Sequence, residues 1–146
     1  MKKIFITAMA GMLCILTSCN DNSTTATEKT SGQRNKNLEA NHTVEKAFET
    51  GDASKVDSVI SADFVDHTNQ GDKKGVDSLK AMINMIHTNF KDMKMEKLHE
   101  TADDEYVFSQ MHYSGNSDGA MGMPKGPYSM NVVEVTKYKD GKAVEH

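Results

Sequence analysis

Hydrophobic positions repeat at helical spacing in the first half of the chain and at alternating spacing in the second half. Ala40, Val44, Ala47 and Phe48 share one face of an amphipathic helix, for which Gly51 supplies a left-handed stop. Two more helical patterns follow, a short one with apolar residues Val56, Val59 and Ile60 and a longer one with Val76, Leu79, Ile83, Ile86 and Phe90. Between these two patterns, Phe64 and Val65 are expected to form a short extended piece, and glycines bracket a polar loop at 71–75.

After Phe90 the period changes to two, which is typical of strands. Strands are predicted around 93–98, 106–114 and 128–139. Asp140-Gly141 is a hairpin signal, so that residues 142–146 begin a return strand. Three helices followed by a meander predict an α+β fold in which the helices cover one face of an antiparallel sheet.

The return strand is short for its partner. A two-residue turn would place Val144 opposite Lys137 and His146 opposite Val135, which leaves residues 130–134 without a partner on that side. A long unpaired edge promotes unwanted association. We therefore expect either that another strand covers this edge or that the last strand is truncated.

The first residues follow the order of a bacterial lipoprotein signal. Lys2 and Lys3 form a positive region, and the apolar stretch 4–16 is shorter than the roughly 20 residues that span a bilayer. It ends in Leu16-Thr17-Ser18-Cys19, which resembles a lipobox, so residues 1–19 are interpreted as a signal peptide that ends at a lipidated Cys19. The alternative is an ordinary secretory signal in which this cysteine is incidental.

Residues 20–37 are polar, with Ala26 as their one apolar side chain, and we expect them to form a disordered tether. The folded domain would then comprise residues 38–146, anchored to a membrane of the bacterial cell envelope on its periplasmic or surface side. With Cys19 acylated and Cys14 removed with the leader, this domain has no thiol for a disulfide, a nucleophile or a metal site.

Charge limits the partners. The formal net charge of −4 excludes a basic nucleic-acid binder. Without Lys2 and Lys3 the net charge becomes −6, and an acidic domain is not attracted to an anionic membrane. The acyl chains on Cys19 would therefore make the contact with the lipid bilayer.

Three stretches of the domain resemble a known family. They are the opening helix with its Gly-Asp stop, AFETGDASKVDSVIS, the segment ADFVDHTNQGDKKGVDSLKAMI, and the closing KYKDGKAVEH. Their order and spacing resemble a SnoaL-like domain of the NTF2-like superfamily. The resemblance implies a cone in which three N-terminal helices pack on a curved sheet around an apolar pocket.

Members of this family differ in activity. Those similar to polyketide cyclases and ester cyclases close rings by an intramolecular aldol-type reaction, in which a base takes a proton beside a carbonyl and a donor stabilises the enolate, without a metal or cofactor. Other members bind small molecules or proteins without turnover, and NTF2-like domains often dimerise through the sheet.

This chain departs from the catalytic members at two places. Their Glu-His is followed by Trp and then by an acid/base Asp, whereas this chain ends at His146, and their Thr-His pair is replaced by Ser114-Gly115-Asn116. These departures favour a protein that binds a small, mostly apolar molecule. A cofactor-independent cyclase- or isomerase-like enzyme is the alternative, and a module that forms a homodimer through its sheet is a third hypothesis.

His67 and His112 are the catalytic candidates, because an imidazole can act as base or donor near neutral pH. We expect His67 at the pocket mouth; the alternative is a loop histidine bonded to backbone carbonyls. His112 shares a strand face with Phe108 and Gln110, and we expect this face to be concave. On a convex face these residues would be solvated.

The candidate ligand-binding residues are Asp66, Phe108, Gln110, Tyr128 and His146. A terminal His146 would otherwise be frayed. The remaining histidines, His42, His87 and His99, show no ligand spacing with one another, so no metal site is predicted.

Overall fold

The computed structural model describes residues 23–146, and the predicted signal peptide lies outside them. The elements are α1 (Ser23–Thr50), α2 (Val56–Val59), β1 (Ile60–Thr68), β2 (Gly71–Lys74), α3 (Val76–Asn89), β3 (Phe90–Ala102), β4 (Tyr106–Ser117), the short 3-10 helix η1 (Ala120–Gly122), β5 (Gly126–Lys139) and β6 (Lys142–Glu145). Within the described part of the chain, no helix combines the length and apolar character that crossing a membrane requires.

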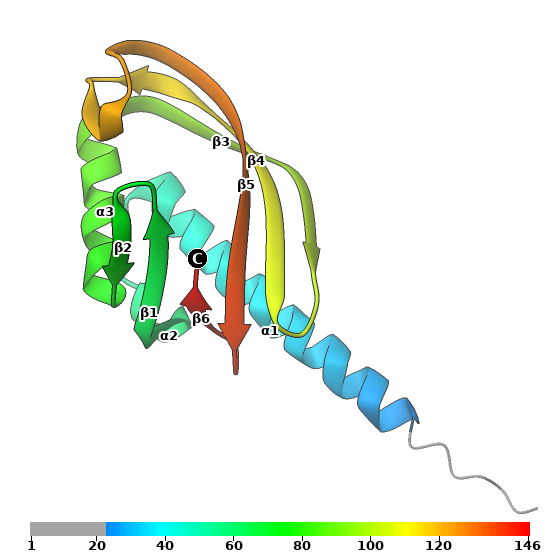
Figure 1. The fold of residues 1–146 in the computed structure, drawn as a ribbon. Coiled ribbons are helices and arrows are strands. Elements are labelled where there is room, and N and C mark those ends of the chain that lie inside the picture. The colour runs from blue at the N-terminus through cyan, green and yellow to red at the C-terminus, as the bar shows by residue number, and fades with distance from the viewer. Residues whose placement is uncertain (1–22) are drawn as a thin grey trace, which may run out of the picture.

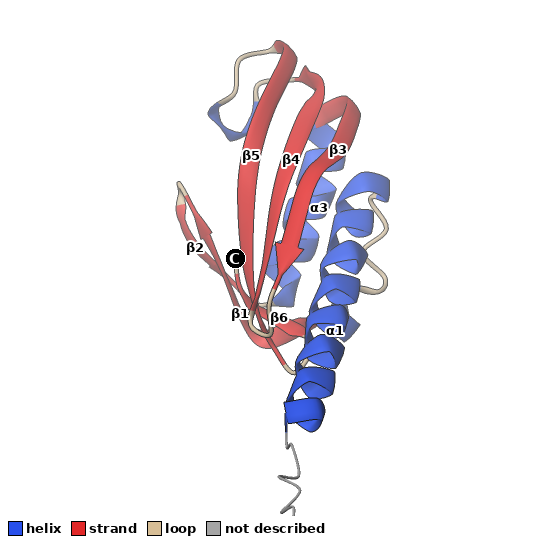
Figure 2. Ribbon diagram, turned by 90° about the vertical axis from the view of Figure 1, so that its right-hand side faces the viewer, coloured by secondary structure: helices blue, strands red, loops and turns tan. Residues whose placement is uncertain are grey.

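The strands form one sheet in the order β2-β1-β6-β5-β4-β3. The long strands β3, β4 and β5 curve over α1 and α3, which lie on the same side of them (Figures 1 and 2). The predicted α+β fold of three helices on a curved sheet is therefore confirmed. The sheet is mixed rather than purely antiparallel, because β6 turns back from β5 and pairs in parallel with β1.

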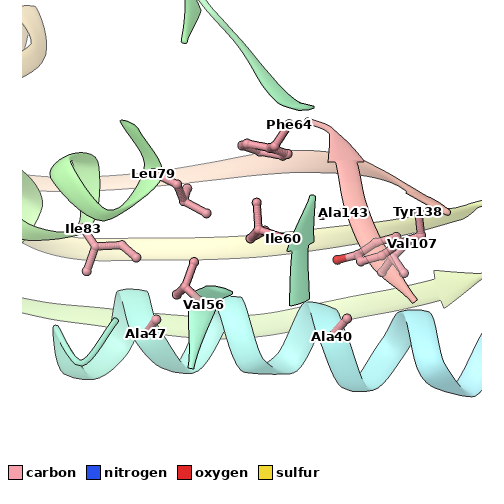
Figure 3. Close-up of a cluster of buried hydrophobic side chains, with 10 residues drawn as sticks. All are labelled: Ala40, Ala47, Val56, Ile60, Phe64, Leu79, Ile83, Val107, Tyr138 and Ala143. Atoms are coloured by element: carbon pink, nitrogen blue, oxygen red, sulfur yellow. The ribbon is translucent and has the colours of Figure 1, made fainter. Parts of the chain in front are cut away.

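Small side chains allow α1 to lie close to the sheet. Ala40 and Ala47 are each 2% exposed and are two turns apart on one helix face. Figure 3 shows them directed toward a cluster contributed by the other elements. The cluster also contains Val56, Ile60, Phe64, Leu79, Ile83, Val107, Tyr138 and Ala143.

The predicted tether at 20–37 is wrong for residues 23–37, which are helical. The end of this segment is held by buried polar contacts rather than by apolar ones. The side chain of Asn37 is fully buried, and its Nδ2 donates to the carbonyl oxygen of Asp104 at 2.9 Å. Gln33 Nε2 donates to Asn37 Oδ1 at 2.9 Å. An apolar pattern cannot reveal an anchor of this kind.

The predicted polar loop at 71–75 is also wrong, because residues 71–74 form β2, which pairs with β1. All four residues of β2 are exposed, so this edge strand buries no face and has no alternating pattern. The β1–β2 hairpin projects beside the end of β6 (Figure 1).

The hairpin between β5 and β6 begins as predicted, with Lys139 opposite Lys142. A register shift then places Glu145, rather than Val144, opposite Lys137. Among the described residues, β5 has no strand partner on the β6 side from Gly126 to Thr136, which confirms the expected half-paired edge.

Candidate functional site

The inner face of the long strands is the face directed toward the helices. In β4, Val107, Ser109 and Met111 are 1%, 3% and 2% exposed, and alternate residues of a strand share a face. Tyr113 continues this alternation. The register pairs Ser109 with Glu134 of β5, so Glu134 also lies on the inner face.

Strand β1 brings a second carboxylate to the inside. Phe64 and Asp66 are two residues apart and are 2% and 5% exposed, so both side chains point inward. A carboxylate buried to this extent requires hydrogen-bond partners. His146 is such a partner, with its Nδ1 at 3.1 Å from Asp66 Oδ1.

Backbone hydrogen bonds hold His146 in place beside β1. Its N–H donates to the carbonyl oxygen of Val65 at 2.9 Å, and its own carbonyl accepts from the N–H of His67 at 2.7 Å. The hydrogen bond to Asp66 is the main cause of a raised imidazole pKa, and the charge of Glu134 raises that pKa further. Among the described residues, none forms a hydrogen bond with Nε2 of His146, which leaves this nitrogen available to a ligand.

Tyr113 and Glu134 form a second polar pair on the inner face. The phenol of Tyr113 donates to Glu134 Oε1 at 2.6 Å. Burial and the neighbouring Glu134 carboxylate raise the pKa of Tyr113 strongly, so the phenol stays protonated. Because Glu134 influences the pKa of both Tyr113 and His146, the two pairs lie within electrostatic range of each other. We call Asp66, His146, Tyr113 and Glu134 the inner polar site.

The inner polar site combines a titratable imidazole with a permanent donor. The Asp66 carboxylate orients the ring of His146 through Nδ1, so Nε2 accepts a proton in the neutral ring and donates one in the protonated ring. The phenol of Tyr113 is an additional donor. These groups suit proton exchange with, or hydrogen bonding to, a small molecule that carries a carbonyl or hydroxyl group.

Residues 40–146 match the family model described as the SnoaL-like domain. The chain belongs to this family. This match, which covers most of the chain, confirms the resemblance found in the sequence. Among curated proteins, none matches the chain.

Solved structures similar to this SnoaL-like domain support the same fold. TsrD from Streptomyces laurentii superimposes with a TM-score of 0.68 at 17% identity, over 77% of this chain and 86% of that protein. A proposed polyketide cyclase from Xanthomonas campestris pv. campestris has a TM-score of 0.62 at 16% identity, over 77% and 88% of the two chains. IdmH, a proposed polyketide cyclase from Streptomyces antibioticus, has a TM-score of 0.61 at 19% identity, over 75% and 87%.

His67, expected at the mouth of a pocket, lies on the exposed face of β1 in this SnoaL-like domain. It follows Asp66 in β1 and points to the opposite face, where its side chain is 50% exposed. Its Nδ1 is 2.8 Å from Asp72 Oδ1, and its Nε2 is 3.0 Å from Glu145 Oε1. Because carboxylates only accept, both contacts together require a protonated ring, and the two carboxylates raise its pKa.

The face that carries Phe108, Gln110 and His112 is the outer face, so the prediction of a concave face is wrong. Phe108 is 40% exposed, and Val133, which pairs with Gln110 across the strands, is 69% exposed. The Nδ1 of His112 lies 2.7 Å from Oδ1 of Asn131, its cross-strand neighbour on β5. Both faces of β4 contain aromatic and polar residues, so alternation could not decide which of them is covered.

Tyr128 is placed at the other end of the inner face, at the start of β5. It pairs with Gly115, and its ring meets that of Phe90 edge-on with the centroids 5.6 Å apart. A methyl group on Gly115 would lie 3.1 Å from the Tyr128 ring and 2.9 Å from the Lys91 carbonyl oxygen. The glycine therefore lets this aromatic pair pack closely against the sheet.

Two groups of residues were missed in the sequence. Tyr113 lies on the same strand as His112 but on the opposite face, and its partner Glu134 follows from the pairing of β4 with β5. The second group is His42, Glu45 and Glu100, whose side-chain ligand atoms all lie within 4.8 Å of one another. His42 and Glu45 are three residues apart on α1, a spacing visible in the sequence, whereas only the fold adds Glu100.

Proposed function

We propose that this SnoaL-like domain binds a small, mostly apolar molecule on its inner side, with the inner polar site as its polar contact. The family and the fold support a small-molecule-binding or cyclase-like function. The observation that carries the proposal is the Asp66–His146 contact, because a buried carboxylate orients an imidazole whose Nε2 has no partner among the described residues.

Thermal shift with a library of small hydrophobic carbonyl and hydroxyl compounds tests this proposal. A compound that binds only the folded state must raise Tm. We expect at least one such compound, and we expect Asp66→Asn to reduce its effect because the substitution changes the partner of His146. His112→Ala on the outer face is the matched control and should leave the shift intact. A library without a hit, or equal losses in both variants, would contradict the proposal.

A cyclase- or isomerase-like reaction is the alternative for the same site. His146 would exchange the proton through Nε2, and the Tyr113 phenol would stabilise the developing oxyanion. In this case His146→Gln should abolish turnover while the fold is retained. The histidines first expected to be catalytic provide the counter-test, since turnover that disappears only in the His67→Ala, His112→Ala double variant would place the chemistry elsewhere.

We also propose that the outer face of the sheet pairs with a second copy of the chain. Phe108, Val133 and Val135 are 40%, 69% and 41% exposed on neighbouring strands. Val133 also borders a hollow of about 180 Å³ that Phe108 and Gln110 help to line. A protruding side chain beside a hollow on one face allows two copies to fill each other's hollow in a twofold arrangement. Light scattering should give a dimer, and Val133→Lys should give a monomer.

We further propose that Cys19 anchors the protein to a bacterial envelope membrane through acyl chains. The support is the order of residues 1–19, from the basic start to Leu-Thr-Ser-Cys. Labelling with a fatty-acid analogue in a bacterial host should mark the wild-type chain and not Cys19→Ala, which should move to the soluble fraction. Label that persists in the variant would contradict the anchor.

A further inference from the structure

A charged cluster lies between α1 and β3. Strand β3 is at the opposite edge of the sheet from the β1–β2 hairpin, so the cluster is separated from the Asp66–His146 contact by several strands. His42 Nε2 is 2.8 Å from Glu100 Oε2. Glu45 follows His42 after three residues on the same helix, so both side chains point to one side of α1. One ligand atom each from His42, Glu45 and Glu100 falls within 4.8 Å of the others.

A buried amide fixes the two carboxylates of this cluster. The Nδ2 of Asn41 lies 3.0 Å from Glu45 Oε1 and 3.3 Å from Glu100 Oε1. Asn41 is only 8% exposed, and its Oδ1 accepts from the phenol of Tyr138 at 2.9 Å. Neighbours that orient the ligating groups in this way are a regular feature of metal sites in proteins.

The cluster already holds a cation. The ammonium of Lys97 lies 2.8 Å from Glu45 Oε2 and 2.6 Å from Glu100 Oε1, between the two carboxylates. The side chains of Glu45 and Glu100 are only 19% and 16% exposed, so the pair requires a positive charge nearby. Lys97 is more exposed, at 27%, and its long flexible side chain can move into solvent.

We propose that His42, Glu45 and Glu100 bind a divalent transition-metal ion of the zinc class, which exchanges with the Lys97 ammonium. A neutral imidazole and two carboxylates match the charge and the ligand preference of Zn²⁺, whereas the nitrogen ligand disfavours Mg²⁺ and Ca²⁺. The side chain of His42 is 51% exposed, so an ion from solvent can reach the cluster. The site shares no residue with the inner polar site and does not depend on the function proposed for it.

Calorimetric titration of the chelator-treated full chain with Zn²⁺ tests the proposal. We expect one equivalent to bind to the wild type, and His42→Ala to weaken that binding by at least about tenfold. His99→Ala is the matched control, because His99 is exposed on the same strand as Glu100 and is no member of the cluster. No binding at 100 μM Zn²⁺, or equal losses in the two variants, would overturn the proposal.

Lys97→Met separates a metal site from a network of ion pairs. Removing the competing ammonium should tighten Zn²⁺ binding by about tenfold or more, and Zn²⁺ should restore any Tm that the variant loses. If the network is only structural, Lys97→Met lowers Tm and Zn²⁺ restores none of it, a result that overturns the proposal. Glu100→Gln keeps the size of the side chain and serves as a second variant, in which binding should also be lost.

Discussion

The neighbouring β1 residues Asp66 and His67 each take part in a histidine–carboxylate contact, on opposite faces of the sheet. On the inner face, the Asp66 side chain is 7% exposed and binds one nitrogen of His146. On the outer face, His67 lies between Asp72 and Glu145, and all three side chains are about half exposed. The contacts have similar lengths and lie on neighbouring residues, but their environments differ.

Because the two contacts differ in exposure and not in length, we expect exposure to decide what each contributes to stability. Water and salt screen the outer contact, so either partner can be lost at little cost. The inner carboxylate is removed from water and depends on its protein partners. The outer imidazole has both nitrogens engaged, whereas the inner one keeps Nε2 for a ligand.

The largest expected effect is the difference in stability between removing the inner carboxylate and removing the outer one. We expect Asp66→Ala to lower the free energy of unfolding by about 1–3 kcal/mol, because it leaves His146 without its acceptor in a partly buried place. Asp72→Ala removes a carboxylate from the outer contact and should change little. Urea denaturation of both variants measures the difference, and equal losses would show that burial does not separate the two contacts.

The same comparison extends to the two faces of β4. Tyr113→Phe removes the hydroxyl that donates to Glu134 on the inner face, and we expect a loss of about 0.5–1.5 kcal/mol. Tyr106→Phe, on the outer face of the same strand, should lose less, because no described residue forms a hydrogen bond with its hydroxyl. Urea denaturation measures both losses. A larger loss for Tyr106→Phe would contradict the assignment of the two faces.

The sequence predicts those elements whose apolar side chains meet one core. The stripe that includes Leu79 and Ile83 gives α3, and Gly51 ends α1 with a φ of 78°, as expected. The first part of α1 was missed because it is held by polar bonds from Asn37 to a turn far along the chain. Strand β2 was missed because it buries no side chain.

The inner polar site was predicted only in part. Asp66 and His146 were candidates, but their contact depends on the parallel pairing of β1 with β6, which no local pattern encodes. The choice between His112 and Tyr113 depends on which face of β4 is covered, and both faces carry an aromatic residue beside polar ones. A register or a face that is set by distant elements cannot be obtained from alternation alone.

The smallest expected effect is on the pH dependence of stability. The pKa of His146 is raised in the folded state, chiefly by its bond to Asp66 and further by the charge of Glu134, although burial and nearby His67 lower it. The pKa of His67 is raised by Asp72 and Glu145. A raised folded-state pKa stabilises the fold fully below the unfolded-state value of about 6.5, and this contribution is lost as the pH rises through the folded-state value.

Unfolding free energies measured by urea denaturation from pH 5 to pH 9 should therefore fall as the pH rises above about 6.5. His146→Gln should remove the larger part of this slope, because its carboxylate partner is buried and little screened. His67→Gln should remove the smaller part, and the slope that remains in this variant should depend less on added salt than the slope that it removes. If His67→Gln flattens the profile more than His146→Gln does, the exposed contact is the stronger of the two, and the ranking by burial fails.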